Sequence, residues 1–155
     1  MSEEKERDSR LVIECLREML SRMGVEGAIE EGVVGDTTTY IIRTREAGIL
    51  IGEDGQNLAA FNHLLRKIIE KQSGPEATPF LLDVNDYQRH RFEEIKERAR
   101  MGAQRVRYFK KEVVLQPMSA FDRRVVHLAL QEYPDITTES VGEGAERRIV
   151  IKPYP

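Results

Sequence analysis

The stretch "GILIGEDGQNL", Gly48–Leu58, contains the pattern Gly-x-x-Gly between a short apolar run and the start of an apolar-periodic segment. A turn of this form, with a helix behind it, can bring backbone amides and a helix N-terminus close to a phosphate group. The two residues between the glycines are Glu53 and Asp54, whose negative charges would repel that phosphate. The stretch therefore poses two problems: which fold holds this turn, and whether the turn binds an anion.

The segments on both sides of the turn predict a small α+β unit, residues 1–85, with three strands and with helices on one face of the sheet. Apolar residues at helical spacing predict the helices, and runs of β-branched and aromatic residues predict the strands. In chain order we expect a helix, two strands, the turn, a second helix and a third strand, at residues 9–23, 27–34, 37–44, 52–55, 58–69 and 80–84. Asp8 or Ser9 is the expected cap of the first helix, and a turn at Gly35–Asp36 is expected to join the first two strands.

The second part of the chain, residues 86–155, is predicted to be a basic unit that begins with a long helix. Residues 1–86 contain 10 Lys/Arg and 17 Asp/Glu, whereas residues 87–155 contain 14 Lys/Arg and 10 Asp/Glu. Coulombic attraction would therefore bring a polyanion to the second part. The expected order is the long helix, a strand, a short capped helix and a hairpin, at residues 86–109, 112–117, 119–133 and 137–153. The long helix carries aromatic residues that either stack on bases or fill the core, namely Tyr87, Tyr108 and Phe109.

The short capped helix carries the second group of candidate binding residues. Ser119 with Asp122 three residues later forms a capping box at its start. The side chains expected to be buried lie on one stripe, Phe121, Val125 and Leu128. Arg123 and His127 are four residues apart and project from the same face, with Arg124 beside them. Guanidinium and imidazole groups both offer N–H donors to a phosphate; the alternative is a solvated helix face with a histidine at its edge.

The sequence contains no recognised catalytic, metal or cofactor motif. Its three histidines have no metal-ligand spacing with one another, with Cys15 or with carboxylates, and no P-loop, nucleophile elbow or dinucleotide fingerprint is present. We therefore expect a protein that is not an enzyme and that needs no cofactor. Cys15, the single cysteine, lies on an apolar helical stripe and is expected to be buried. No apolar run approaches the ~20 residues that cross a membrane, so we expect no membrane span and a cytoplasmic location.

The order of these motifs resembles a known bacterial family. The segments "GILIGEDGQNLAAFNHLLRKI", "FLLDVNDYQRHRFEEIKERA", "MSAFDRRVVHLALQ" and "ERRIVIKP" follow one another as in the Jag family, the SpoIIIJ-associated or KhpB proteins. The resemblance extends over residues 8–152 and implies a KH domain, a linking helix and an Arg-x-x-x-His (R-three-H) domain that binds single-stranded nucleic acid. It implies that Arg123 and His127 hold a phosphate and that Gly52 and Gly55 form the KH clamp.

The resemblance also implies a role and partners. Family members are associated with RNA binding and with the regulation of cell elongation and division, or of sporulation. The implied partners are single-stranded RNA, with single-stranded DNA as the alternative, and either a small protein made of a KH domain alone or a second copy of the chain. Longer members carry an additional N-terminal domain, whereas this sequence starts close to the first KH helix, so that domain is either absent or lies outside the given sequence.

The acidic turn departs from the family pattern, in which a Lys or Arg usually stands between the two glycines. Two like charges ~4 Å apart repel by ~1 kcal/mol even in bulk water, and by more near a surface of lower dielectric. With both Glu53 and Asp54 present, we expect the KH unit to be a poor RNA clamp and mainly a platform for folding and dimerisation. Binding would then fall to Arg123, His127 and the basic helix. The alternative function is a protein-interaction adaptor, in which the acidic KH unit docks a partner.

Overall fold

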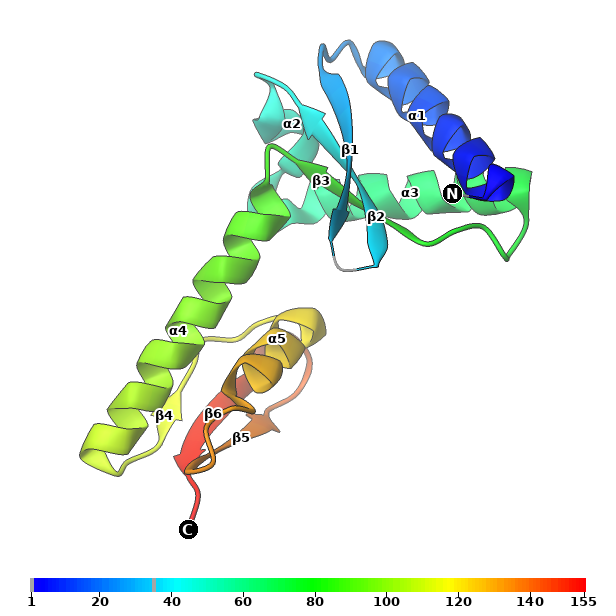
Figure 1. Ribbon diagram of the computed structural model, residues 1–155. Helices are drawn as coiled ribbons and strands as arrows, with labels where there is room; N and C mark the ends of the chain where they lie inside the picture. Colours follow the sequence, from blue (N-terminus) through cyan, green and yellow to red (C-terminus); the bar gives the residue numbers. More distant parts are fainter. Residues whose placement is uncertain (1, 35) are drawn as a thin grey trace. The chain divides into compact units, whose positions relative to one another are not determined.

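The computed structural model describes residues 2–34 and 36–155, and it divides into two compact units, Met1–Gln88 and Arg89–Pro155 (Figure 1). The first unit contains α1 (Glu3–Met23), β1 (Ala28–Val34), β2 (Thr37–Arg43), α2 (Ala47–Ile51), η1 (Glu53–Gly55), α3 (Gln56–Ser73) and β3 (Phe80–Val84). The long helix α4 (Tyr87–Phe109) is followed by β4 (Val113–Val114), α5 (Ala120–Leu130), β5 (Ile136–Val141), η2 (Gly144–Glu146) and β6 (Arg148–Pro153). This mixture of helices and two small sheets confirms the predicted α+β class.

The first unit is a three-stranded sheet with its core on one face. The strand order is β1-β2-β3, in which β1 and β2 are antiparallel and β2 and β3 are parallel. Side chains of alternate strand residues point to opposite faces of a sheet, and those of Tyr40, Ile42 and Leu82 are buried together against α1 and α3. The turn predicted at Gly35–Asp36 includes Gly35, which lies outside the described residues, and the two strands that flank it are antiparallel as expected.

Helix α1 begins earlier than predicted. Its cap is Ser2, whose Oγ accepts a hydrogen bond from the backbone N–H of Lys5 at 3.4 Å, so the prediction of Asp8 or Ser9 as the cap was wrong. Three glutamates in the first turn are stabilised by the positive end of the helix dipole, which accounts for the earlier start. The end of α1 was predicted correctly, because Gly24 forms a left-handed C-cap.

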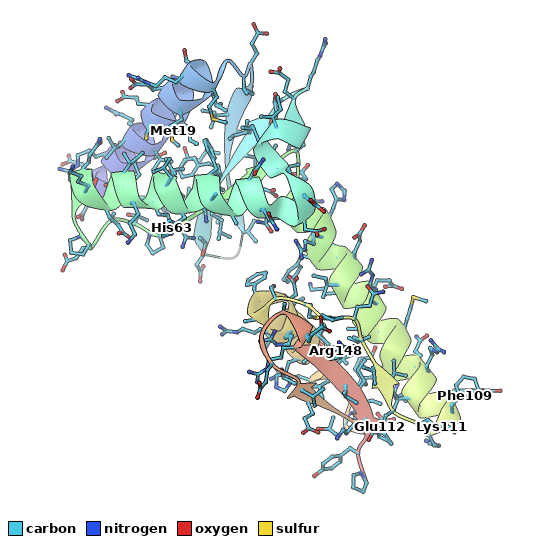
Figure 2. All side chains as sticks on the ribbon, turned by 180° about the vertical axis from the view of Figure 1, so that it is seen from behind. Met19, His63, Phe109, Lys111, Glu112 and Arg148 are labelled. Atoms are coloured by element: carbon cyan, nitrogen blue, oxygen red, sulfur yellow. The ribbon has the colours of Figure 1, made fainter. Side chains whose placement is uncertain are left out.

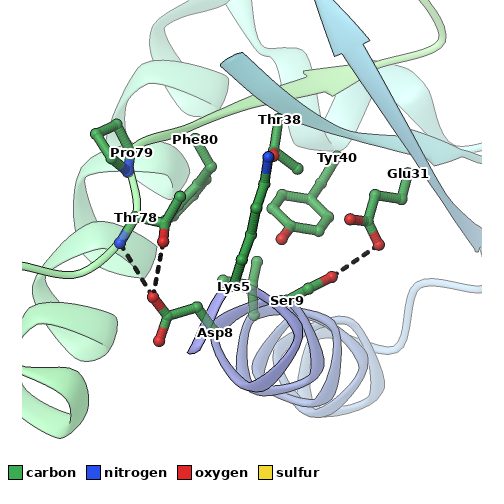
Figure 3. Close-up of a pocket in the computed structure, with 10 residues that line it drawn as sticks. Lys5, Asp8, Ser9, Glu31, Thr38, Tyr40, Thr78, Pro79 and Phe80 are labelled. Atoms are coloured by element: carbon green, nitrogen blue, oxygen red, sulfur yellow. Dashed lines mark hydrogen bonds between the residues drawn. The ribbon is translucent and has the colours of Figure 1, made fainter. Parts of the chain in front are cut away.

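The carboxylate of Asp8 instead joins α1 to the segment before β3. It is buried and accepts hydrogen bonds from the backbone N–H of Thr78 at 3.1 Å and from its hydroxyl at 3.0 Å (Figure 3). Beside it, the Ser9 hydroxyl donates to Glu31 at 2.7 Å. The cavity next to these bonds has a volume of only about 10 Å³, which is room for about one water molecule. Asp8 therefore stabilises the fold, and this cavity is too small for an organic ligand.

The second unit is a three-stranded antiparallel sheet of order β4-β6-β5 that packs against α4 and α5. Small residues on α4 allow close packing, since a Cβ added at Gly102 would lie 2.7 Å from the Cδ1 of Ile151 on β6. The core of this unit contains Ala99, Ala103 and Val106 from α4, Val125, Val126 and Leu130 from α5, and Ile136, Ile149 and Ile151 from the sheet. The predicted strand at 112–117 is reduced to the two residues of β4.

Helix α5 is rotated relative to the prediction. Of the three residues expected to be buried, only Val125 is, whereas Phe121 is 64% exposed and Leu128 is 52% exposed. The buried positions include Asp122, whose carboxylate accepts a hydrogen bond from Arg91 of α4 at 2.8 Å. This ion pair turns the Asp122 side of α5 toward α4, and it leaves the Phe121 side facing the solvent.

Candidate nucleic-acid interface

Backbone geometry requires both glycines of the Gly-x-x-Gly turn. Gly52 has φ 70° and ψ −176°, a conformation that is essentially restricted to glycine. A Cβ added at Gly52 would lie 2.5 Å from the Cγ of Asn57, whose amide donates to the Ile49 carbonyl at 3.0 Å. Gly55 has φ 77°, and a Cβ there would lie 3.0 Å from the ring of Tyr87. The fold therefore accounts for both glycines without a bound strand, and their role in binding stays a prediction.

The residues between the glycines make this turn acidic. Glu53 and Asp54 are both exposed, and Asp54 takes the left-handed conformation with φ 52°. Both precede α3 directly, where the helix dipole favours a negative charge by about 0.3–1 kcal/mol each. Any phosphate at this helix N-terminus would meet the two carboxylates there, so the turn stays predicted to be a poor site for an anion.

A cap and an ion pair fix the start of α5. The Ser119 Oγ accepts a hydrogen bond from the backbone N–H of Asp122 at 3.1 Å, which is the first half of the predicted capping box. The carboxylate of Asp122 forms the ion pair with Arg91 of α4. These two interactions hold the first turn of α5, on which the next residues are Arg123 and Arg124.

The side chain of Arg123 is held by the loop that precedes α5. Its Nη1 donates to the carbonyl oxygen of Met118 at 2.8 Å, and the backbone N–H of Met118 donates to the carbonyl of Arg147 at 3.1 Å. Arginine has five N–H donors, so one bond to a carbonyl leaves others for a ligand. Arg124, the next residue, has an exposed side chain. The structure thus brings the predicted Arg123 near the backbone of Arg147, which the sequence had not singled out.

A threonine on the neighbouring strand orients His127. The Nδ1 of His127 lies 2.6 Å from the Oγ1 of Thr138 on β5, and the imidazole is exposed. Two residues further along the same strand face, the hydroxyl of Ser140 accepts a hydrogen bond from the Nε of Arg147 at 2.9 Å. In the sequence, the only indication of this arrangement is that Thr138 and Ser140 are two residues apart in "TTES" and therefore share a strand face. Which side chains they contact depends on how the hairpin packs. We call the group of Arg123, Arg124, His127, Thr138 and Arg147 the α5–β5 surface.

The long helix contributes both structural and exposed residues. Arg107 is engaged in the fold, because its Nε and Nη2 donate to the two carboxylate oxygens of Asp135 at 2.7 Å each, and this pairing lowers the pKa of Asp135. Tyr87 is half-buried against the core of the first unit. By contrast, Tyr108 is 82% exposed and Phe109 is 61% exposed, in the last turn of α4, and Figure 2 shows Phe109 at that end of the helix. These two residues can reach a base, but they do not belong to the α5–β5 surface.

Residues 2–34 and 36–155 contain no group of three or more His, Cys, Asp or Glu side chains that could hold a metal ion. Over the same residues, no helix combines the length and the apolar character that a membrane span needs.

Two domain models match the chain, and the ranges that they match overlap at residues 93–116. A KH domain model matches residues 16–116, and an R-three-H domain model matches residues 93–153. The chain is 30% identical over 129 residues to the RNA-binding protein KhpB of Clostridium symbiosum, a match that covers 83% of this chain and 58% of the relative. It is 28% identical over 142 residues to the protein of that name from Lactiplantibacillus plantarum, covering 92% of this chain and 44% of the relative.

A third relative, the RNA-binding protein KhpB of Bacillus subtilis, is 32% identical over 117 residues, which cover 74% of this chain and 56% of the relative. The chain thus spans about half the length of the curated relatives that it matches. The KH match extends over more than half of the chain, and the R-three-H match follows it in the same order as the two units. The chain therefore belongs to the Jag family of proteins, in which an R-three-H domain follows a KH domain.

Proposed function

We propose that this protein binds single-stranded nucleic acid, RNA in the first place, through the α5–β5 surface, as a cytoplasmic regulator without catalytic activity. The relatives named RNA-binding protein KhpB support RNA as the ligand. The regulatory role expected from the family, in cell elongation and division or in sporulation, is part of the same proposal. The α5–β5 surface adds Arg124 and Arg147 to the motif pair Arg123 and His127, so that three arginines and one histidine serve one strand.

The observation that carries the proposal is the pre-orientation of Arg123 and His127. The bond from Arg123 to the Met118 carbonyl fixes the guanidinium and leaves further N–H donors for a phosphate. The contact between His127 and Thr138 uses Nδ1, so the second ring nitrogen, Nε2, stays available for a ligand. Side chains that are already oriented lose less conformational entropy when they bind, which favours a specific grip over a diffuse basic patch.

The Gly-x-x-Gly turn contributes little to binding in this proposal. Its glycines are explained by the backbone, and Glu53 and Asp54 repel a phosphate. The first unit then serves as a folding and dimerisation platform, which pairs either with a second copy or with a small protein made of a KH domain alone. Removing the two carboxylates should accordingly leave RNA binding unchanged or improve it.

Titration of single-stranded RNA against three variants tests the proposal. The double substitution Arg123→Ala/His127→Ala should weaken binding by about tenfold or more, because two charge-assisted contacts are lost. Glu53→Lys/Asp54→Lys should not weaken it. The matched control is His63→Ala/Lys67→Ala, an exposed pair with the same spacing on α3. Binding that is lost equally in the control, or that is unaffected by the first double substitution, contradicts the assignment.

The same titration also tests whether the α5–β5 surface distinguishes RNA from DNA. Contacts to phosphates do not read the 2′-hydroxyl that distinguishes RNA from DNA. Single-stranded DNA of the same sequence should therefore bind to the α5–β5 surface as well, unless groups outside it contact the ribose. Equal dependence of RNA and DNA binding on Arg123 would support a phosphate grip.

One observation favours a second function, that of a protein-interaction adaptor. The acidic turn begins three residues after Ile49, an apolar side chain that is largely exposed on α2. An exposed apolar residue beside negative charges suits a basic, partly apolar protein surface better than a nucleic acid. The ratio of absorbance at 260 and 280 nm of protein purified at low salt, followed by a gel shift, separates the two functions. No bound nucleic acid and no shift would favour the adaptor.

A further inference from the structure

The solvent side of α5 carries two large apolar side chains beside its basic ones. Phe121 and Leu128 are more than half exposed, although their spacing predicts a buried stripe. Single exposed apolar residues are common on protein surfaces and need no explanation. Here, however, two of them lie on the same helix face as Arg124, which belongs to the α5–β5 surface.

Helix geometry gives the arrangement of this face. An α-helix has 3.6 residues per turn, so each residue is rotated by about 100° from the preceding one. With the buried side of α5 defined by Val125, Val126 and Leu130, the remaining side chains follow one another around the helix in a fixed order. That order is Arg123, His127, Arg124, Leu128 and Phe121. The outer face of α5 is therefore basic along one edge and apolar along the other, with Arg124 between the two.

This division matches the chemistry of a single strand. A single-stranded nucleic acid presents a charged backbone and, beside it, the apolar faces of unpaired bases. Proteins bind such strands by combining a positive track with aromatic side chains on which bases stack. The basic edge of α5 suits the backbone, and the adjoining apolar edge suits a base attached to it. A protein partner could also cover the apolar edge. A nucleic acid in addition supplies negative charge to the basic edge beside it, so it fits both edges.

We propose that Phe121 stacks on a nucleobase of the bound strand, next to the phosphate held by Arg123 and His127. Leu128, two helical turns further along, extends the apolar platform, and Arg124 lies between the base and the backbone. This inference rests on the proposed function, since it assigns a base-binding position to the same surface. It adds a contact that depends on the presence of bases, whereas a phosphate grip alone does not.

The absence of tryptophan from the chain provides a direct assay. Phe121→Trp would introduce a single tryptophan at an exposed position where the larger ring can be accommodated. Stacking on a base should quench its fluorescence when single-stranded RNA is added. A strand of abasic sugar phosphates with the same number of charges should leave the fluorescence unchanged. Equal quenching by both strands, or no quenching by RNA that demonstrably binds, would overturn the inference.

Affinity measurements on a second variant test the same contact without a reporter. Phe121→Leu should weaken the binding of RNA by about 5- to 150-fold, the range expected for loss of one stacked base. It should leave binding of the abasic strand unchanged. The control is Leu64→Ala, which removes a comparably exposed apolar side chain from α3 and should change neither affinity.

The possible outcomes separate this inference from the proposed function. If the wild-type protein binds neither strand, the proposed function fails, and the stacking contact with it. If the wild type binds RNA through Arg123 and His127 but Phe121→Leu changes nothing, only the stacking contact is refuted. If Phe121→Leu leaves RNA binding intact and abolishes self-association instead, the apolar edge is a protein interface and the inference is wrong.

Discussion

Replacing Arg123 by lysine should weaken RNA binding strongly even though it retains the positive charge. In the structure the guanidinium donates one N–H to the Met118 carbonyl at 2.8 Å, and its remaining donors can contact a phosphate. A lysine ammonium is a point donor at the end of a flexible stem, and it cannot satisfy the carbonyl and hold a phosphate with two parallel bonds. Arg123→Lys should therefore lose either the bond to the Met118 carbonyl that fixes the side chain or one of the contacts to the phosphate.

The size of the effect follows from what each substitution removes. A hydrogen bond to a charged group contributes about 1.5–3 kcal/mol, so the loss of one contact in Arg123→Lys corresponds to an increase in Kd of about 10- to 150-fold. The charge is kept, so the dependence of log K on log salt should retain its slope. Arg123→Ala also removes the charge, and its slope should fall by about 0.7, the value for one phosphate contact to a single strand.

The assay is titration of a labelled single-stranded RNA by fluorescence anisotropy at several salt concentrations, for the wild type and the two variants of Arg123. Thermal unfolding of each variant checks that the loop around Met118 stays folded, since its bond to Arg123 is lost or altered in both. The reasoning is refuted if Arg123→Lys binds like the wild type. It is also refuted if Arg123→Ala loses affinity without any change in the salt slope, because the residue would then not contact a phosphate.

Three other substitutions or reactions test separate features of the structure. Arg91→Ala should lower the free energy of unfolding by about 1–3 kcal/mol in urea denaturation. The loss is smaller than for a fully buried pair, because Arg91 is about one-third exposed. Asp122→Asn in the same chain should recover part of the loss, since it removes the unpaired carboxylate. Cys15 is only partly buried, whereas the sequence predicted burial, and this partial burial raises the pKa of its thiol. At neutral pH the thiol should therefore react with a thiol reagent more slowly in the native state than in urea. Its contribution to the free energy of unfolding should fall at alkaline pH, because the thiol of the unfolded chain ionises first. Thr138→Val should weaken RNA binding, measured by the same titration, because it removes the hydroxyl that lies 2.6 Å from the Nδ1 of His127 and orients the imidazole.

The order and type of the main elements could be predicted from the sequence because each rests on local signals. The stop of α1 at Gly24 and the cap of α5 at Ser119 are determined by residues within one turn. The errors arose where a distant residue decides the outcome. Asp8 resembles a cap in sequence, yet its carboxylate binds Thr78, which is 70 residues away.

Which face of α5 is buried could likewise not be predicted from local signals alone. The apolar positions of this segment fit two stripes, one through Phe121 and Leu128 and the other through Val126 and Leu130. Periodicity cannot choose between them, because both share Val125 and both follow the helical repeat. The pairing of the acidic residue after Phe121 with α4 selects the second stripe, and that pairing is a tertiary contact.

The candidate site likewise contains residues that local spacing identifies and residues that only tertiary packing brings in. Arg123 and His127 were identified because their spacing on one helix face is itself the signal. Thr138 and Arg147 were missed because nothing in their own segments indicates which helix their side chains will contact. Both come from the final hairpin, and its strand register together with its packing against α5 brings them to the predicted pair.

The two candidate binding motifs differ in how much of their chemistry the fold already explains. Gly52 and Gly55 are required by backbone conformation and by the close approach of neighbouring side chains, so they would persist in a KH unit that binds no strand. The exposed imidazole of His127 and the exposed side chain of Arg124 make no comparable contribution to the core. A feature that folding demands gives no independent support for binding, whereas oriented, exposed donors do. The proposed nucleic-acid contact therefore rests on the α5–β5 surface and not on the phosphate-binding form of the acidic turn.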